Sequence, residues 1–349
     1  MKRKYNRFNF YLFALGVLIF CTLVVYMYNP SYITRSEAYN TSSEIQEEIL
    51  LNKQTASIEK NRFKRAYESN WDDAAGHSFD EHEDRDTSKL ILAVPKSLLS
   101  KHTLHTFTQL LNFLESDTGY PIALRQVDSY ASLMEQYHAG AIDFAFSGRL
   151  SAALIEKEGT RPIPIASPIP IEERSYHALI VADQQLDENI FFELEGKAFA
   201  FTDPLSATGH FYPMHLINQY QLPVPEKFFS HHFYTYCPKD AILSVLSGVT
   251  AAASTNSITF DRLKEDRPEA VDELQVMHTS TPMDPPVLIA SPHVSSQITE
   301  DWKTFFQRVH QDEKGETILE SLGWERLITG EAIDYKPLEH YGEVLDNEF

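Results

Sequence analysis

The chain has 349 residues and a formal net charge of −20, with 23% charged and 43% hydrophobic residues. This acidic excess argues against a nucleic-acid partner, which needs a basic patch, but local dipoles can still bind a small anion. The two cysteines are Cys21, which lies in an apolar run, and Cys237, so we expect no disulfide in the rest of the chain.

The N-terminus combines basic residues with a long uncharged run. Three of the first four residues are basic, as is Arg7, and residues 10–28 carry no charge. As a helix this run would span about 28 Å, enough to cross a hydrocarbon core. Basic residues on the short side keep that end in the cytoplasm. We therefore expect a cytoplasmic tail at residues 1–9 and a transmembrane signal anchor at 10–28. The main domain would then lie in the periplasm, attached to a bacterial inner membrane.

Two other interpretations of this run remain open. A cleaved signal peptide should end in small residues, whereas Tyr26, Met27 and Tyr28 stand at that place. A lipoprotein would attach lipid at Cys21, but Phe20 before it is large for that motif. We favour an uncleaved anchor.

Residues 29–88 read as a linker, partly helical within 44–67, where apolar residues are spaced among charges. Residues 72–86 are acidic and polar, with no apolar face to bury. Because nothing there supplies a rigid site, we interpret them as a solvated tether rather than a metal site. Four residues of the segment have metal-ligand chemistry, namely His77, Asp80, His82 and Asp84.

From Lys89 onward the hydrophobic pattern alternates between strands and helices. This alternation indicates the α/β class, with parallel strands flanked by helices. About 260 residues is large for one core, so two lobes are expected. The expected strands are 90–94, 121–126, 142–146, 178–182, 197–201, 249–253 and 287–290. The expected helices are 104–114, 130–139, 211–220, 240–246, 300–309 and 315–322.

The segment 201–210 lies between an expected strand and an expected helix. This order delivers Ser206, Thr208 and the Gly209 amide to a helix N-terminus. Free N–H groups and the positive end of the helix dipole suit that place to an anion. Serine and threonine are also ordinary N-caps, so plain helix capping remains an alternative.

Several segments in the expected order resemble one known family. Tyr130 precedes the Gly-Ala-Ile-Asp-Phe-Ala stretch at 140–145, and a tyrosine introduces the strand in 175–181. Residues 203–209 read Asp-Pro-Leu-Ser-Ala-Thr-Gly. The chain also carries Pro-Met-Asp-Pro at 282–285 and Leu-Gly-Trp at 322–324. Across Leu90–Tyr341 the chain resembles the periplasmic solute-binding components of phosphate, phosphite and phosphonate ABC importers.

This resemblance implies a type II periplasmic binding protein fold at residues 89–349. Two α/β lobes would close on a ligand, lobe 1 being about 89–177 plus 287–349 and lobe 2 about 178–286. The implied ligand is a small oxyanion, such as phosphate or phosphonate, and no cofactor or metal is implied. The resemblance and nearby polar positions give eight candidate ligand-binding residues: Tyr130, Tyr176, Ser206, Ala207, Thr208, Gly209, Asn256 and Asp284.

The chain departs from the family pattern at three places. Ala207 replaces a hydroxyl residue of the loop, Pro238 stands where a histidine is frequent, and Ala251 stands where an acid is expected. His231 and His232 are candidates to replace the missing histidine. Since a dianion needs several donors, a pocket with fewer leaves a ligand other than phosphonate open.

Three functions follow from these patterns. The first is a membrane-tethered binding protein that delivers its ligand to an ABC permease. The second is a sensing adaptor that signals through a membrane partner, which the anchor and the long linker favour. The third, an enzyme on the same scaffold, is the least favoured, because no nucleophile elbow, metalloprotease motif or nucleotide loop is present. Packing alone remains an alternative role for Tyr130 and Tyr176, and Cys237 is expected to be a buried, unreactive thiol.

Overall fold

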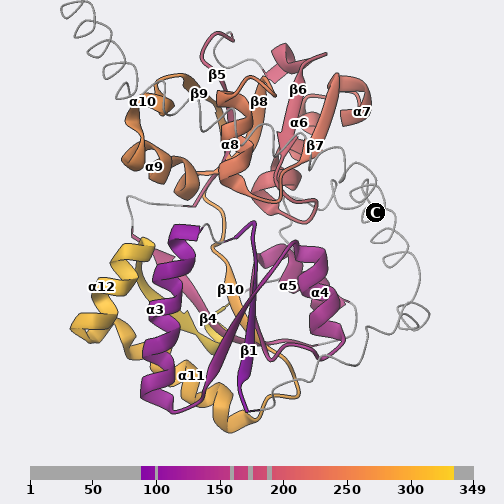
Figure 1. Ribbon diagram of the computed structural model, residues 1–349. Coiled ribbons are helices and arrows are strands. Elements are labelled where there is room, and N and C mark those ends of the chain that lie inside the picture. Colours follow the sequence, from indigo (N-terminus) through magenta and orange to yellow (C-terminus); the bar gives the residue numbers. More distant parts are fainter. Residues whose placement is uncertain (1–87, 99–100, 158–160, 172–175, 187–190, 334–349) are drawn as a thin grey trace, which may run out of the picture.

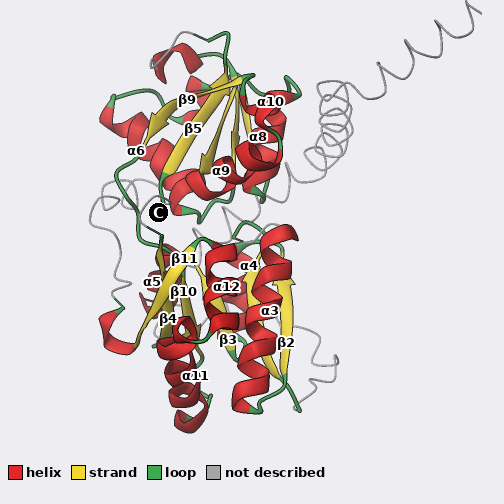
Figure 2. Cartoon of the chain, turned by 90° about the vertical axis from the view of Figure 1, so that its left-hand side faces the viewer, coloured by secondary structure: helices red, strands yellow, loops and turns green. Residues whose placement is uncertain are grey.

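The computed structural model describes residues 88–98, 101–157, 161–171, 176–186 and 191–333 (Figure 1). The described chain forms two α/β lobes, one above the other in both views (Figures 1 and 2). The lower lobe joins elements from both ends of the described chain, whereas the upper lobe comes from its middle. We call them lobe 1 and lobe 2. Residues 10–28 and the linker lie outside the described ranges, within which no helix is long and apolar enough to cross a membrane.

Lobe 1 contains a six-stranded sheet in the order β11-β4-β10-β3-β1-β2. β1 pairs in parallel with β2 and β3, whereas β10 and β11 run antiparallel to their neighbours. The strands are β1 (Leu90–Pro95), β2 (Ile122–Val127), β3 (Phe144–Ser147), β4 (Ile163–Pro170), β10 (Val287–Ala290) and β11 (Trp324–Thr329). The helices are α3 (Lys101–Thr118), α4 (Tyr130–His138), α5 (Arg149–Lys157), α11 (Ser296–Arg308) and α12 (Glu313–Leu322).

Both faces of this sheet are covered by helices, which explains the continuous apolar run of β1. Leu92 and Val94 pack with α3, α11 and α12, while Ile91 and Ala93 pack with α4 and α5. A strand buried on both faces needs apolar residues at every position. Phe144 stacks on Trp302 of α11 with ring centroids 3.7 Å apart, on the face of the sheet covered by α3, α11 and α12.

Lobe 2 contains a five-stranded sheet in the order β7-β6-β8-β5-β9. β6 runs parallel to β7 and β8, and β5 runs antiparallel to β8 and β9. The strands are β5 (Ala178–Asp183), β6 (Ala198–Phe201), β7 (His231–Tyr234), β8 (Ala252–Asn256) and β9 (Leu274–Thr279). The helices are α6 (Tyr212–Gln219), α7 (Pro225–Phe228), α8 (Pro238–Leu246), α9 (Ser257–Asp266) and α10 (Pro268–Val271).

The α/β class and most expected elements agree with the structure, but the sheets are mixed rather than parallel. The sequence pattern missed four strands, β4, β7, β9 and β11. β4 was hidden by Pro164, Pro168 and Pro170, which lack the N–H that a sheet normally uses; its pairing with both neighbours contains register shifts. The strand expected at 249–253 lies at 252–256, because the amides of Val249 and Thr250 still bond to Ser244 in the preceding turn.

Candidate functional site

A loop of lobe 2 presents free backbone donors at the carboxyl edge of its sheet. The loop follows β6 and enters one turn of π-helix, Ala207–Phe211, which continues into α6. Ser206 caps this turn, since its hydroxyl accepts from the Gly209 amide at 3.0 Å. Within the described residues, the amides of Ala207 and Thr208 have no acceptor. Helix capping is therefore the role of the Ser206 hydroxyl, and the N–H groups of Ala207 and Thr208 remain available for a ligand.

Gly209 is required by close packing rather than by an unusual backbone angle. A Cβ at this position would lie 2.4 Å from Thr202 Cβ and 2.7 Å from its Oγ1. Thr202 is itself fixed, because its hydroxyl donates to the carbonyl of Ser254 at 3.0 Å and its amide donates to the carbonyl of Gly209. The loop can therefore lie this close to the sheet only because residue 209 has no side chain.

Asp203 links this loop to lobe 1. One carboxylate oxygen accepts from the Leu205 amide at 2.8 Å, inside the loop. The other accepts from the Tyr130 amide at 3.0 Å, at the first residue of α4. Asp203 is buried, so these charge-assisted bonds lie away from bulk water. The carboxyl edges of the two sheets therefore face each other, with Tyr130 directly opposite the loop.

Two phenols and a threonine hydroxyl lie between these edges. The Tyr176 hydroxyl is 3.5 Å from Thr208 Oγ1, which is 3.4 Å from the Ser206 hydroxyl. Burial raises the pKa of Tyr130 well above its usual range, as do Tyr176 and Asp203, whereas the Ser97 hydroxyl lowers it. Burial also raises the pKa of Tyr176, and the hydrogen bond with Thr208 opposes this. Both phenols therefore stay neutral at physiological pH and can donate a proton in a hydrogen bond.

Two serines of lobe 1 that the sequence analysis did not single out lie at the same edge. Ser97 follows β1, and Ser147 ends the neighbouring parallel strand β3. Both hydroxyls are buried and have no hydrogen-bond partner among the described residues. The sequence signal was a polar residue at the carboxyl end of an apolar strand, which is where open α/β sheets bind ligands.

The other candidates occupy different positions. Ala207 lies in the loop, and Asn256 ends β8, which runs parallel to β6 and so reaches the same edge. The Asn256 side-chain oxygen caps α9 by accepting from the Thr259 amide at 2.9 Å. Asp284 is exposed in the segment that returns from lobe 2 to lobe 1. No hydrogen bond of the described chain joins Asp284 to the loop.

His231 and His232 are not brought to the loop. They pair with Ala198 and Phe199 at the amino end of β6, whereas the loop leaves from the carboxyl end. The suggestion that they replace a family histidine is therefore wrong. Within the described ranges, no group of three or more histidine, cysteine or acidic side chains is placed to hold a metal ion. The possible metal ligands at residues 77–84 lie outside those ranges.

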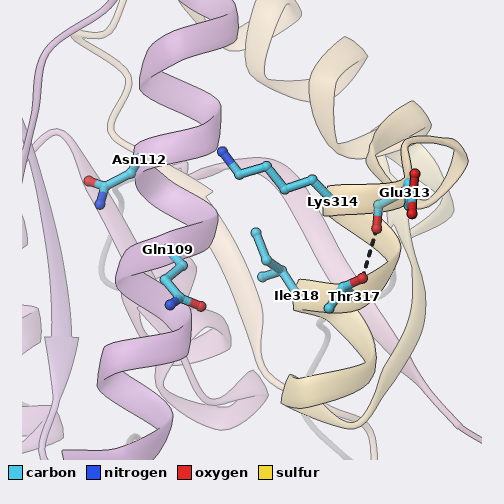
Figure 3. A pocket seen from close by; sticks show the side chains of 6 residues that line it. All are labelled: Gln109, Asn112, Glu313, Lys314, Thr317 and Ile318. Atoms are coloured by element: carbon cyan, nitrogen blue, oxygen red, sulfur yellow. Dashed lines mark hydrogen bonds between the residues drawn. The ribbon is translucent and has the colours of Figure 1, made fainter.

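A hollow of about 560 Å³ lies on the outer surface of lobe 1, between α3 and α12 (Figure 3). Its lining contains no residue of the inter-lobe group. We do not assign it to the candidate site, because its mixed polar side chains are solvated on two surface helices and converge on no common point. The residues that line it are Gln109, Asn112, Glu313, Lys314, Thr317 and Ile318.

Comparison with known proteins agrees with this architecture. The chain is 29% identical over 111 residues to the phosphate-import protein PhnD of Mycolicibacterium smegmatis, an alignment that covers 31% of this chain and 35% of that protein. The chain thus matches about a third of the length of this curated relative.

Two solved structures share the fold. One is a binding protein component of an ABC phosphonate transporter from Pseudomonas aeruginosa, with a TM-score of 0.64 and 18% identity, covering 70% of this chain and 82% of that one. The other is PhnD1 of Prochlorococcus marinus in complex with methylphosphonate, with a TM-score of 0.66 and 17% identity. This match covers 75% of this chain and 99% of that one.

These likenesses identify the two-sheet α/β fold of type II periplasmic binding proteins. Residues 93–335, well over half of the chain, match the family described as "ABC transporter, phosphonate, periplasmic substrate-binding protein". That family consists of transport proteins rather than enzymes. The chain therefore belongs to the periplasmic substrate-binding proteins of phosphonate ABC transporters.

Proposed function

We propose that this protein binds a small tetrahedral oxyanion, phosphate or a phosphonate, between its two lobes and delivers it to an ABC importer in the membrane. The observation that carries this proposal is the convergence of neutral donors at the facing sheet edges. Lobe 2 supplies the free amides of Ala207 and Thr208 and the hydroxyl of Thr208. The phenols of Tyr130 and Tyr176 complete the group.

Neutral donors are a suitable set for an oxyanion that must later be released. Amides and hydroxyls satisfy the several acceptor positions of the ligand without burying an opposing charge. The first turn of the helix beyond Ser206 adds the positive end of its dipole. The Asn256 amide group supports the same assignment, because capping uses only its oxygen and leaves the nitrogen as a donor. Asp284, being exposed, would lie at the rim.

We further propose that lobe 1, about 89–177 plus 287–349, and lobe 2, about 178–286, move as two bodies. A ligand held by donors from both would favour the closed arrangement, since only that arrangement makes all the contacts. The Asp203–Tyr130 bond joins the two lobes, which supports the interpretation that the described conformation is the closed one.

The test is Thr208→Ala, measured both for affinity and for stability in the full-length chain. Calorimetric titration with inorganic phosphate and methylphosphonate should show binding to the wild type. Loss of one hydrogen bond to a charged ligand should weaken it about ten- to a hundredfold. If Thr208 merely supports the helix start, the variant loses about 1 kcal/mol of stability at unchanged affinity. Thr250→Ala is the matched control, because this buried hydroxyl bonds to Ser244 and not to the loop.

The basic N-terminus and the uncharged run at residues 10–28 favour a membrane-tethered form of the protein. Tethering in turn supports a second candidate, a ligand-sensing adaptor that signals through a membrane partner. A C-terminal alkaline phosphatase fusion should be active and sediment with membranes. Deleting the gene should abolish uptake of the bound oxyanion if the protein serves an importer. Unchanged uptake together with a lost transcriptional response to that oxyanion would favour the adaptor instead.

A further inference from the structure

Ser97 and Ser147 are placed alike at the inner edge of lobe 1. Ser97 is 5% exposed and Ser147 is fully buried. Ser97 follows the carboxyl end of β1, and Ser147 is the last residue of β3, the adjacent parallel strand. This is the edge that Asp203 of lobe 2 reaches when it binds the Tyr130 amide. Both serines therefore lie on the side of lobe 1 that faces the donor loop of lobe 2.

The direction of the Ser147 side chain follows from the alternation along β3. Phe144 and Phe146 pack into the layer of α3 and α11, whereas Ala145 packs into the layer of α4. Since alternate residues share a face, Ser147 lies on the same face as Ala145, with Tyr130 of α4. The next residue, Gly148, touches Tyr130 so closely that a Cβ there would lie 3.1 Å from the phenol oxygen. Ser147 thus lies on the face of the sheet that carries Tyr130 and is next in sequence to the residue that touches the phenol.

Ser97 reaches the same phenol from β1. Its hydroxyl is near enough to lower the pKa of Tyr130. The geometry there nevertheless does not satisfy a hydrogen bond for the Ser97 oxygen. Ser97, Tyr130 and Ser147 therefore come from three segments of lobe 1 that end at one edge, and the two serine hydroxyls have no partner in the described part of the chain.

A buried hydroxyl without a partner opposes folding, and most buried hydroxyls in proteins are paired. Ser244 and Ser254 follow that rule here, since each is fully buried and bonds to backbone carbonyls. Trp302 also has an unpartnered nitrogen, but it lies in the helical layer of lobe 1, stacked on Phe144. Among the residues that the structure describes, only the two serines combine an unpartnered buried hydroxyl with a position at the edge facing lobe 2.

We propose that Ser97 and Ser147 are ligand-binding residues, which together with Tyr130 form the lobe 1 half of the oxyanion site. This inference rests on the function proposed above and extends its site to residues outside the family motifs. A hydroxyl both donates and accepts, so these serines suit an oxyanion that still carries a proton. The ligand would then receive donors from both lobes, amides from lobe 2 and hydroxyls from lobe 1.

The experiment compares Ser97→Ala and Ser147→Ala with the wild type in the full-length chain. Titration with inorganic phosphate and methylphosphonate gives the affinity, and a thermal melt without either probe gives the stability. For whichever of the two probes the wild type binds, each variant should have an affinity at least about tenfold lower. The melting temperature should stay unchanged or rise, because the variant removes an unsatisfied polar group. Replacing a ligand-binding residue thus lowers affinity without lowering the melting temperature, whereas replacing a structural residue does the reverse.

Ser244→Ala is the matched control. It removes an equally buried hydroxyl that is bonded to Ala241 and Thr250, so it should lower the melting temperature and leave affinity unchanged. Unchanged affinity in both edge variants would overturn the inference while leaving the proposed function intact. If the wild type binds neither probe, the proposed oxyanion function fails, and this inference fails with it. Because Ser97 lies in a turn, its variant decides the question even if Ser147→Ala does not fold.

Discussion

At the scale of single residues, the candidate site depends on atoms that are missing as much as on atoms that are present. Gly209 has no side chain, and Thr202 fills the space where one would stand. Ala207 contributes an amide to the loop but no hydroxyl. The loop can therefore lie close to the sheet, and its first two amides have no acceptor among the residues that the structure describes. Substitutions that add atoms here should be more harmful than those that remove them.

We expect Gly209→Ala to destabilise the protein by about 1–3 kcal/mol, because the added carbon overlaps Thr202. It should also abolish measurable oxyanion binding, since the loop must move away from Tyr176. Thermal melts and calorimetric titration measure both effects. Gly140→Ala is the comparison, because nothing lies within 4 Å of that Cβ and its cost of about 1 kcal/mol comes from φ of 68°. Equal behaviour of the two variants would contradict the steric argument.

Cys237 should be a slow nucleophile in the folded protein. Burial, with a contribution from Asp240, raises the pKa of its thiol to about 11. At pH 8 only about one thiol in a thousand is then ionised, and the thiolate is the reactive form. In a Cys21→Ser background, alkylation by iodoacetamide should be slow when the chain is folded and fast in denaturant. A folded rate equal to that of a free thiol would contradict this view, and Cys237→Ser supplies the blank.

At the scale of elements, α6 and β9 are joined by a histidine held between two phenols. His278 of β9 lies 2.6 Å from the Tyr212 hydroxyl through Nδ1 and 3.2 Å from the Tyr220 hydroxyl through Nε2. Burial lowers the pKa of His278 below 6.5, and the nearby His215 acts in the same direction, whereas the backbone at Thr279 opposes it. The structure therefore favours neutral His278.

This geometry predicts an acid-sensitive contribution to stability. A folded-state pKa below the unfolded value means that the unfolded chain takes up the proton first. Neutral His278 therefore contributes its full share of stability above pH 6.5, the unfolded-state pKa. This stability is lost as the pH falls below 6.5 and through the lower folded-state pKa. His278→Gln should flatten the decline of the melting temperature between pH 7 and 5. His231→Gln, at an exposed position of β7, should leave the decline unchanged, and an identical decline in both variants would refute the prediction.

At the scale of the whole molecule, a second contact joins the lobes away from the candidate site. Arg262 of α9 in lobe 2 donates to the hydroxyl of Thr103 in α3 and, at 3.2 Å, to the carbonyl of Ser321. Ser321 is in the last turn of α12, where free carbonyls carry partial negative charge. Figures 1 and 2 both show α9 on the side of lobe 2 that faces these two helices of lobe 1. Arg262 therefore joins the two lobes without reaching the donor loop.

We expect Arg262→Ala to shift the free protein towards an open arrangement and to weaken oxyanion binding about two- to fivefold, as the loss of a partly exposed contact would. Small-angle scattering should give a larger radius of gyration for the free variant, and saturating ligand should restore the wild-type radius. Lys264→Ala removes the same charge from an exposed position of the same helix and should change neither quantity. An unaltered radius and affinity in Arg262→Ala would mean that the contact does not hold the lobes together.

The sequence by itself determined the class, the order of most elements and the family, because these depend on local periodicity and on motifs that are contiguous along the chain. The strand at 90–94 and the helices near 130–139 and 315–322 follow directly from hydrophobic spacing. The loop at 203–209 was identified as a helix start for the same reason, since capping residues act on amides two or three positions away. What is local in the chain was therefore predictable.

The tertiary structure decided which of these residues meet. The proline-rich β4 becomes a strand because β10 and β11 pair with it on either side, and β8 starts three residues late because the preceding turn continues. Asp203 bonds to Tyr130 over 73 residues of sequence, and two unremarked serines reach the same edge because parallel strands end together. Such contacts leave no periodic signal, since burial and pairing across lobes are set by distant parts of the chain.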